Sequence, residues 1–217
     1  MKICKWTTTL FLTLALVGCG FNDNDDDDNN SNDNPPPADD GGGAAEDPID
    51  LADLQGTWSK RCTTIGTLGF RKDTLTIGAT TFDYFTQLHL PTDTDCSDPA
   101  SFDAKASFTY VVPSFVANGN NNIDMILTTI KAKVNTPAAQ VAANAEELCG
   151  FTDWQIGIEK DVTGLNCIEN LPSSGGDFFQ IFFLGDDRLF VGEIDDDHSG
   201  ETADERPETL EAMPFEK

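Results

Sequence analysis

Residues 81–90 read Thr-Phe-Asp-Tyr-Phe-Thr-Gln-Leu-His-Leu, and the run stops at Pro91. In an extended chain successive side chains point to opposite faces, so every second residue of this run shares a face. Such alternation predicts a β-strand with one face buried in a core. The face in question carries one threonine and four large side chains: Phe82, Tyr84, Thr86, Leu88 and Leu90.

The same two-residue period recurs in several short stretches beyond Leu51. Two of them flank Gly185-Asp186-Asp187, a turn sequence that is typical of a hairpin. Eight or nine short strands at this spacing favour an all-β fold, either a single antiparallel β-barrel of about eight strands or a sandwich. The other predicted strands cover residues 74–77, 108–112, 123–131, 178–184 and 188–194.

One stretch departs from the strand pattern. Thr136 suits a helix N-cap, Pro137 suits the first helical position, and the Ala-rich residues 138–148 end at Cys149-Gly150. We therefore predict one short helix that lies against the barrel between two strands.

The N-terminus has the layout of an export signal. Lys2 and Lys5 precede the apolar run Trp6–Val17, which ends in Leu16-Val17-Gly18-Cys19. The run is shorter than the roughly 20 residues that span a bilayer. Leu-Val-Gly-Cys resembles the lipobox of bacterial lipoproteins, and this resemblance implies cleavage before Cys19, a diacylglycerol on its sulfur and an acylated amino end. The alternatives are a secretory signal cut elsewhere and an uncleaved transmembrane helix.

Three segments follow from this reading: a signal peptide (1–18), a lipidated cysteine with a linker (19–50) and a β-barrel domain (51–217). Between Asn22 and Asp50 the chain is rich in Asp, Asn, Pro and Gly and has no basic residue, so we expect it to be disordered. Gly20 after the cysteine resembles the pattern of lipoproteins sent to the outer membrane. The expected location is therefore the outer membrane, on its periplasmic side or at the cell surface.

The charge of the chain excludes one class of partner. Its 38 acidic and 13 basic residues give a formal net charge of −25. Nucleic-acid binding needs a basic footprint, so we predict no nucleic-acid partner. The expected partners are the membrane, through the lipid, and either a small apolar ligand or another envelope protein.

Four cysteines remain in the predicted domain, and they can form disulfide bonds in the oxidising environment that an exported chain meets. Of the three possible pairings, we favour Cys62–Cys96 and Cys149–Cys167, because each closes a local loop of moderate length. Zinc is the rival use, but no Cys-x-x-Cys pair occurs and the chain has only two histidines.

Gly56-Thr57-Trp58 at the start of the predicted β domain resembles the Gly-x-Trp opening of lipocalins and related calycins. The resemblance implies an eight-stranded barrel whose closed end is plugged by Trp58. It also implies that Trp58 packs against a basic side chain from near the last strand, for which Arg206 and Arg188 are the candidates. With the lipobox and the acidic linker, the chain is also similar to lipocalin-like lipoproteins of Gram-negative bacteria that have no assigned function.

No catalytic motif stands out, and we predict that the chain is not an enzyme. His89 lies on the phase opposite Phe82 and Tyr84, so it is expected to face solvent or a polar rim. His198 lies in an acidic loop, and no Gly-x-Ser-x-Gly sequence occurs.

A weak calcium site is the one metal hypothesis, and no other cofactor is expected. In residues 195–201, Asp195, Asp197 and Ser199 match positions of a calcium loop, and Glu201 adds a further carboxylate. Arg206 stands where that loop needs a bidentate glutamate. The alternative is an acidic, solvated loop.

The predicted function is binding or carriage of a small apolar ligand by a membrane-anchored barrel. The alternatives are a structural or interaction lipoprotein with a filled barrel, and a weak calcium-binding envelope protein. A ligand binder should carry small or polar inward residues on several strands. The predicted inward set is mostly large, which favours a filled barrel: Phe82, Tyr84, Leu88, Phe108, Tyr110, Met125 and Leu127.

Overall fold

A computed structural model describes residues 50–217 except 68, 117–118, 166, 168–175, 186 and 196. The predicted signal peptide, Cys19 and nearly all of the linker lie outside the described residues. The elements are, in chain order, η1 (Leu51–Leu54), β1 (Gly56–Ser59), β2 (Thr63–Thr64), β3 (Phe70–Ile77), β4 (Thr81–His89), β5 (Phe102–Val111), β6 (Asn121–Val134), α1 (Pro137–Ala145), η2 (Leu148–Gly150), β7 (Glu159–Asp161), β8 (Asp177–Gly185), β9 (Arg188–Val191), η3 (Ala203–Glu205) and β10 (Phe215–Glu216).

The strands form a closed antiparallel β-barrel. Around the ring the order is β1, β3, β4, β5, β6, β8, β9 and β10, and the ring closes where Ser59 of β1 pairs with Glu216 of β10. Because each of these strands pairs with its neighbours in the ring in antiparallel fashion, the ring is an up-and-down meander. The all-β barrel of about eight strands with one helix, predicted from the sequence, is confirmed.

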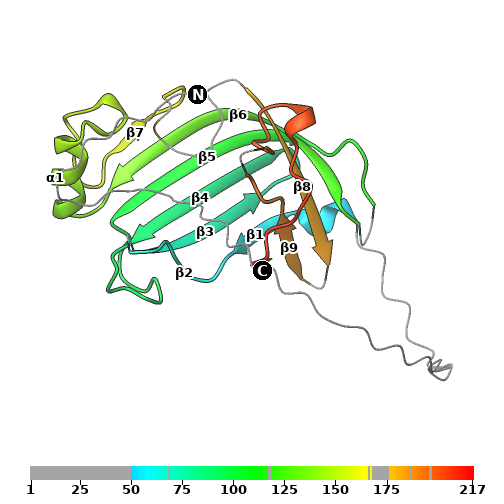
Figure 1. The fold of residues 1–217 in the computed structure, drawn as a ribbon, viewed down its shortest axis with the longest axis horizontal. Coiled ribbons are helices and arrows are strands. Elements are labelled where there is room, and N and C mark those ends of the chain that lie inside the picture. The colour runs from blue at the N-terminus through cyan, green and yellow to red at the C-terminus, as the bar shows by residue number, and fades with distance from the viewer. Residues whose placement is uncertain are drawn as a thin grey trace, which may run out of the picture. The chain divides into compact units, whose positions relative to one another are not determined.

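The ring is complete over only one half of the strand length. At the other end β3 pairs with β2 and β6 pairs with β7, and β2 and β7 form the two edges of an open sheet. Figure 1 shows β3 to β6 running on toward α1, beyond the part that β1, β8 and β9 accompany. The closed half comprises β1, β8, β9 and β10 with residues 74–77, 82–84, 106–110 and 121–127, and the open half comprises residues 70–73, 86–89, 102–104 and 131–134 with β2 and β7.

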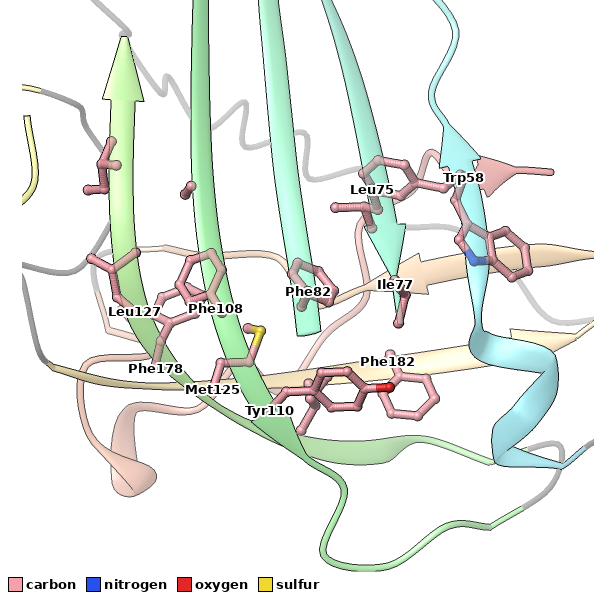
Figure 2. Packing of buried hydrophobic residues seen from close by; sticks show 14 of the residues in the cluster. Trp58, Leu75, Ile77, Phe82, Phe108, Tyr110, Met125, Leu127, Phe178 and Phe182 are labelled. Atoms are coloured by element: carbon pink, nitrogen blue, oxygen red, sulfur yellow. The ribbon is translucent and has the colours of Figure 1, made fainter. Parts of the chain in front are cut away.

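Apolar side chains fill the interior of the closed half. Figure 2 shows them converging from β1, β3, β4, β5, β6 and β8. The rings of Phe82 and Phe108 meet edge to face at 6.0 Å, and Phe108 stacks on Phe178 at 6.1 Å. Burying side chains of this size contributes about 1.5–3 kcal/mol each, so this cluster is the main source of stability of the domain.

The helix α1 lies where the sequence placed it, although it ends at Ala145 rather than near Leu148. The side chain of Thr136 caps it by accepting a hydrogen bond from the backbone N–H of Ala139. Gln140 and Asn144 both donate to the carbonyl of Trp154, whose indole is fully buried. The helix thereby ties the connection after β6 to the core.

Candidate functional site

The inner wall of the open half differs in chemistry from that of the closed half. Strand alternation places Arg71 and Asp73 on the same face of β3 as the core residues Leu75 and Ile77. On β4, Thr86 lies opposite Asp73 across the strand pair. Charged and hydroxyl groups therefore face inward immediately above the apolar core.

Asp73 is the centre of this group, and its side chain is only 1% exposed. Its Oδ2 lies 3.0 Å from Arg71 Nε, although Arg71 Nε is not aligned for a hydrogen bond. The hydroxyl of Thr86 donates to Oδ1 at 2.7 Å, and Asp73 also raises the pKa of the nearby Tyr84 hydroxyl. A buried carboxylate is costly unless it is paired in this way.

A second ion pair completes the group. Lys60, which follows β1 and is 6% exposed, binds Glu211 through its ammonium, which also lies 4.6 Å from the centre of the Phe215 ring. Glu211 acts electrostatically on Arg71 and Tyr84. The six side chains form what we call the inner polar cluster: Lys60, Arg71, Asp73, Tyr84, Thr86 and Glu211.

The charges of the cluster fix the protonation of two members. Burial raises the pKa of the Tyr84 hydroxyl and the negative charge of Asp73 raises it further, so Tyr84 is a neutral hydrogen-bonding group. Burial by itself would lower the pKa of Arg71, but Asp73 and Glu211 outweigh it and the pKa is raised. With two cations and two carboxylates, the cluster has no formal net charge.

Side chains of the open half that remain partly exposed include Arg71, Thr86, Leu88 and Phe102. Their neighbours on β5 and β6 are small and buried: Ala104, Ala106 and Ala132. In the closed half, by contrast, a cavity lined by core side chains measures only about 10 Å³. The large inward set predicted from the sequence thus lies mostly in the closed half. The inward residues of the open half on β3, β4, β5 and β6 include small and polar side chains.

The Gly-x-Trp residues lie at the closed end of the barrel. Trp58 is 1% exposed, and its indole N–H donates to the carbonyl of Leu54 at 2.8 Å. Gly56 has φ of +133°, a conformation that glycine adopts without strain. The resemblance implied Arg206 or Arg188 as the cationic partner of Trp58, whereas Lys217, beside β10, places its ammonium 4.6 Å from the indole ring centre.

Arg206 has a different role from the one the resemblance implied. Its guanidinium donates to the backbone carbonyls of Ile123 and Gln180, at 3.1 and 2.7 Å, and pairs with Asp124 at 2.5 Å. It also stacks 5.2 Å from the Phe179 ring centre. Arg206 therefore fastens the chain before β10 to the β6–β8 strand pair.

In the acidic loop proposed for calcium, two of the four proposed ligands, Asp195 and Ser199, form internal hydrogen bonds. Asp195 Oδ1 accepts from the backbone N–H groups of Asp197 and His198, and it lies 2.9 Å from His198 Nδ1. Ser199 donates to Glu205 at 2.5 Å, and the backbone N–H of Glu201 donates back to Ser199. Within the described part of the chain, no group of three or more His, Cys, Asp or Glu residues is arranged to hold a metal ion.

His89 is buried, contrary to the prediction that it faces solvent. It is 4% exposed, and its Nδ1 lies 2.7 Å from Asp93 Oδ2. Asp93 also accepts from the backbone N–H groups of Ser97 and Asp98, at 2.9 and 3.2 Å. The strand phase of His89 was read correctly, but the loop after β4 folds back over it, which strand alternation cannot reveal.

Both predicted disulfides are present. Cys62, just before β2, bonds Cys96 in the connection between β4 and β5, and Cys149 bonds Cys167 across the segment that contains β7. Each bond thus secures a segment that contributes one edge of the open half. Cys96 and Cys149 have positive φ values of 53° and 57°, which non-glycine residues rarely adopt.

Comparison of the sequence with known proteins assigns the chain to no family. No family model matches the chain, and no curated protein matches it in sequence. None of the helices among the described residues has both the length and the apolar character to cross a membrane. The described residues form a closed antiparallel barrel with one α-helix, and polar side chains lie on its inner wall at one end.

Proposed function

We propose that the chain is an exported, lipid-anchored envelope protein whose barrel binds a small, largely apolar ligand against the inner wall of the open half. The observation that supports this proposal is the partly exposed inner wall, where Leu88 and Phe102 adjoin the inner polar cluster. Ligand sites typically combine apolar surface with a few polar groups that fix orientation. The eight-stranded barrel is compatible with such binding.

The closed half does not offer a site of useful size. A volume of about 10 Å³ is near the minimum for one water molecule, whereas drug-sized ligands occupy about 300–1,000 Å³. The proposal therefore assigns the ligand to the open half and assigns a structural role to the aromatic core. The closed barrel with one helix is consistent with a calycin-like fold, and membership of that group is part of the proposal.

Membrane anchoring rests on the sequence around Cys19. If Cys19 carries the lipid, cells fed labelled palmitate will label the protein, and the membrane fraction will contain it. Cys19→Ser will remove the label and release the protein, whereas Cys4→Ser in the signal will change neither. Labelling that persists in Cys19→Ser would contradict the anchor.

The binding test is native mass spectrometry on the chain from Gly20 to Lys217, exported behind a cleavable signal. This chain retains every described residue and both disulfides, and the compact unit Ile49–Lys217 lies wholly within it. We expect an extra mass of a few hundred daltons that organic solvent removes.

Two matched variants locate the ligand. Thr86→Trp places a large side chain on the inner wall and should abolish the extra mass. Gln87→Trp places the same side chain on the outer face of the same strand and should retain it. A bare mass for the unmodified chain would contradict the carrier and favour the filled barrel.

One observation favours that second candidate, an interaction protein. The outer surface beside β1 has a shallow groove of about 770 Å³. Basic side chains outnumber acidic ones there, although acids predominate in the whole chain. Apart from the buried Lys60 of the inner polar cluster, its charged lining residues are Arg61, Lys72, Asp95, Glu216 and Lys217.

A further inference from the structure

The outer side of the helix α1 is apolar, although it faces solvent. The two polar side chains of the helix, Gln140 and Asn144, point toward Trp154 and donate to its carbonyl. The solvent side carries alanines and Val141, which is 70% exposed. The helix contains no charged residue. A surface helix normally shows the reverse arrangement, with its apolar side toward the core and charged residues outward.

Two isoleucines in the segment before β7 lie beside the start of this helix. Ile156 and Ile158 are 43% and 55% exposed. The glycine between them, Gly157, has φ of +77° and donates its backbone N–H to the carbonyl of Val134 at 2.8 Å. Val134 ends β6 and stands just ahead of α1. The turn therefore holds both isoleucines near the N-terminal end of the helix, and Figure 1 shows the helix and this segment together at one end of the barrel.

A fourth exposed aliphatic side chain is held near the other end of the helix. Leu165 is 40% exposed and closely precedes Cys167, whose disulfide to Cys149 joins it to the segment that follows α1. Large apolar side chains that gather at an exposed place and have polar residues around them mark sites of interaction. We call this set the helix-end surface: Val141, Ile156, Ile158 and Leu165.

The residues around the helix-end surface are mostly acidic. Between residues 137 and 165 the chain has five acidic residues and one basic residue, Lys160. Lys160 pairs with Asp153 at 2.8 Å, and Lys131 of β6 approaches Glu159 at 3.6 Å. Lys133 of β6 is paired with Asp103 instead. Two cations thus meet five carboxylates, which are all exposed: Glu146, Glu147, Asp153, Glu159 and Asp161.

This negative rim decides between the possible occupants of the surface. A second copy of the chain would bring a rim of the same charge against it, and an anionic membrane surface would be repelled in the same way. We infer that the helix-end surface binds a basic amphipathic segment of another protein, with aliphatic side chains on one face and lysine or arginine beside them. Such a segment covers the four aliphatic side chains and pairs with the carboxylates around them. The inference goes beyond ligand binding inside the barrel and does not depend on it.

Fluorescence anisotropy of labelled peptides tests the inference on the chain from Gly20 to Lys217. The probes are a helical Leu/Lys peptide with its leucines on one face, a peptide of the same composition in scrambled order, and an amphipathic Leu/Glu peptide. The scrambled peptide measures attraction by net charge, the acidic linker included. We expect the amphipathic Leu/Lys peptide to bind at least about tenfold more tightly than the scrambled one, because only it can bury its leucines on the surface. Equal binding of these two, or equally tight binding of the Leu/Glu peptide, would overturn the inference.

Two matched double variants, which change no charge, locate the binding. Ile156→Ser/Ile158→Ser should reduce the affinity for the amphipathic Leu/Lys peptide to that for the scrambled one. Val111→Ser/Ile126→Ser is the control: these residues are 62% and 51% exposed on the outer face of β5 and β6, in the part of β6 farther from α1. The control should bind as tightly as the parent chain. Equal losses in the two double variants would overturn the assignment to the helix-end surface.

Two further measurements test the other occupants on the same chain, which lacks Cys19 and therefore any lipid on it. We expect a monomer in sedimentation velocity and no flotation with phosphatidylcholine vesicles. A dimer that Ile156→Ser/Ile158→Ser disperses would overturn the inference in favour of a second copy. Flotation that the same variant abolishes would overturn it in favour of a membrane.

Discussion

His89 and Asp93 show how one buried hydrogen-bonded pair organises a loop. The Asp93 carboxylate binds His89 Nδ1 and two backbone N–H groups, and the loop that it holds includes Cys96. Burial by itself would raise the pKa of Asp93, but the hydrogen bonds from Ser97, His89 and Asp98 outweigh it and lower the pKa. The folded protein therefore binds a proton at Asp93 less readily than the unfolded chain does.

The pH dependence of stability follows from this direction. The contribution of Asp93 is fully present above its ordinary pKa of about 4 and is lost as the pH falls through the lower pKa of the folded state. Asp93→Asn should lower the melting temperature at pH 7, and the difference from the parent should narrow below about pH 4. Thermal unfolding followed by circular dichroism across pH 2.5–7 checks this. Asp98→Asn, whose side chain takes no part in these bonds, is the control, and a gap that widens in acid would refute the assignment.

Some contacts of single residues could be predicted from the sequence, and others could not. The pairing of Cys62 with Cys96 followed from the local loop of moderate length that it closes. The sequence did not predict Lys217 as the partner of Trp58. This contact depends on the pairing of β10 with β1, two strands at opposite ends of the domain sequence. Arg71 and Asp73 carried no motif; the signal that could have found them is the two-residue period of β3, extended upstream from Leu75 to its charged residues.

Among the elements, the two edge strands β2 and β7 depend on covalent support. A strand of two or three residues contributes few ladder bonds, and each of these pairs with only one described neighbour. The disulfides Cys62–Cys96 and Cys149–Cys167 limit how far these edges separate from the sheet.

Removing the two disulfides should have unequal effects. In the chain-entropy model each contributes about 3–4 kcal/mol, and the longer loop contributes about 0.6 kcal/mol more. The sequence separations are 34 for Cys62–Cys96 and 18 for Cys149–Cys167. Urea unfolding of Cys62→Ser/Cys96→Ser and of Cys149→Ser/Cys167→Ser should therefore show the larger loss of free energy of unfolding in the first pair. The reverse order would mean that native-state contacts of β7, rather than loop entropy, dominate.

The strongly periodic elements were predictable and the short ones were not. The strands at 81–89 and 121–134 and the helix α1 were anticipated, because alternation and capping residues are local signals. The first half of β5 was missed because, after Phe102, its inward residues Ala104 and Ala106 are small and do not stand out as apolar. The strands β7 and β10 owe their conformation to neighbours that are distant in sequence.

At the scale of the whole molecule, charge is the dominant feature. Residues 51–217 hold 27 of the 38 acidic and 11 of the 13 basic residues, a net charge of −16 that produces self-repulsion in the folded domain. Exposed ion pairs such as Lys105–Asp83 and Lys131–Glu159 are worth at most about 1 kcal/mol each and do not offset it.

Salt should therefore stabilise the protein. Raising NaCl from 20 mM to 500 mM shortens the range of the repulsion to a few ångströms and should raise the melting temperature by several degrees. A lower melting temperature in high salt would show that ion pairs, rather than net repulsion, control stability. At equal ionic strength CaCl₂ and MgCl₂ should act alike if the loop at 195–201 is merely solvated. A rise specific to calcium would support the weak site at Asp195, Asp197, Ser199 and Glu201.

Because β10 pairs with β1, the strands form a closed ring, and no strand of the ring is first or last in space. Lys217 donates to the carbonyl of Asp53 at 2.8 Å, so the two ends of the domain lie side by side. A short linker can join them, and the tight turn between Gly78 and Thr81 offers a place to open the chain elsewhere while preserving every strand neighbour. Because its two ends lie side by side, the domain can also be inserted into a surface loop of a host protein without separating the host segments on either side of it.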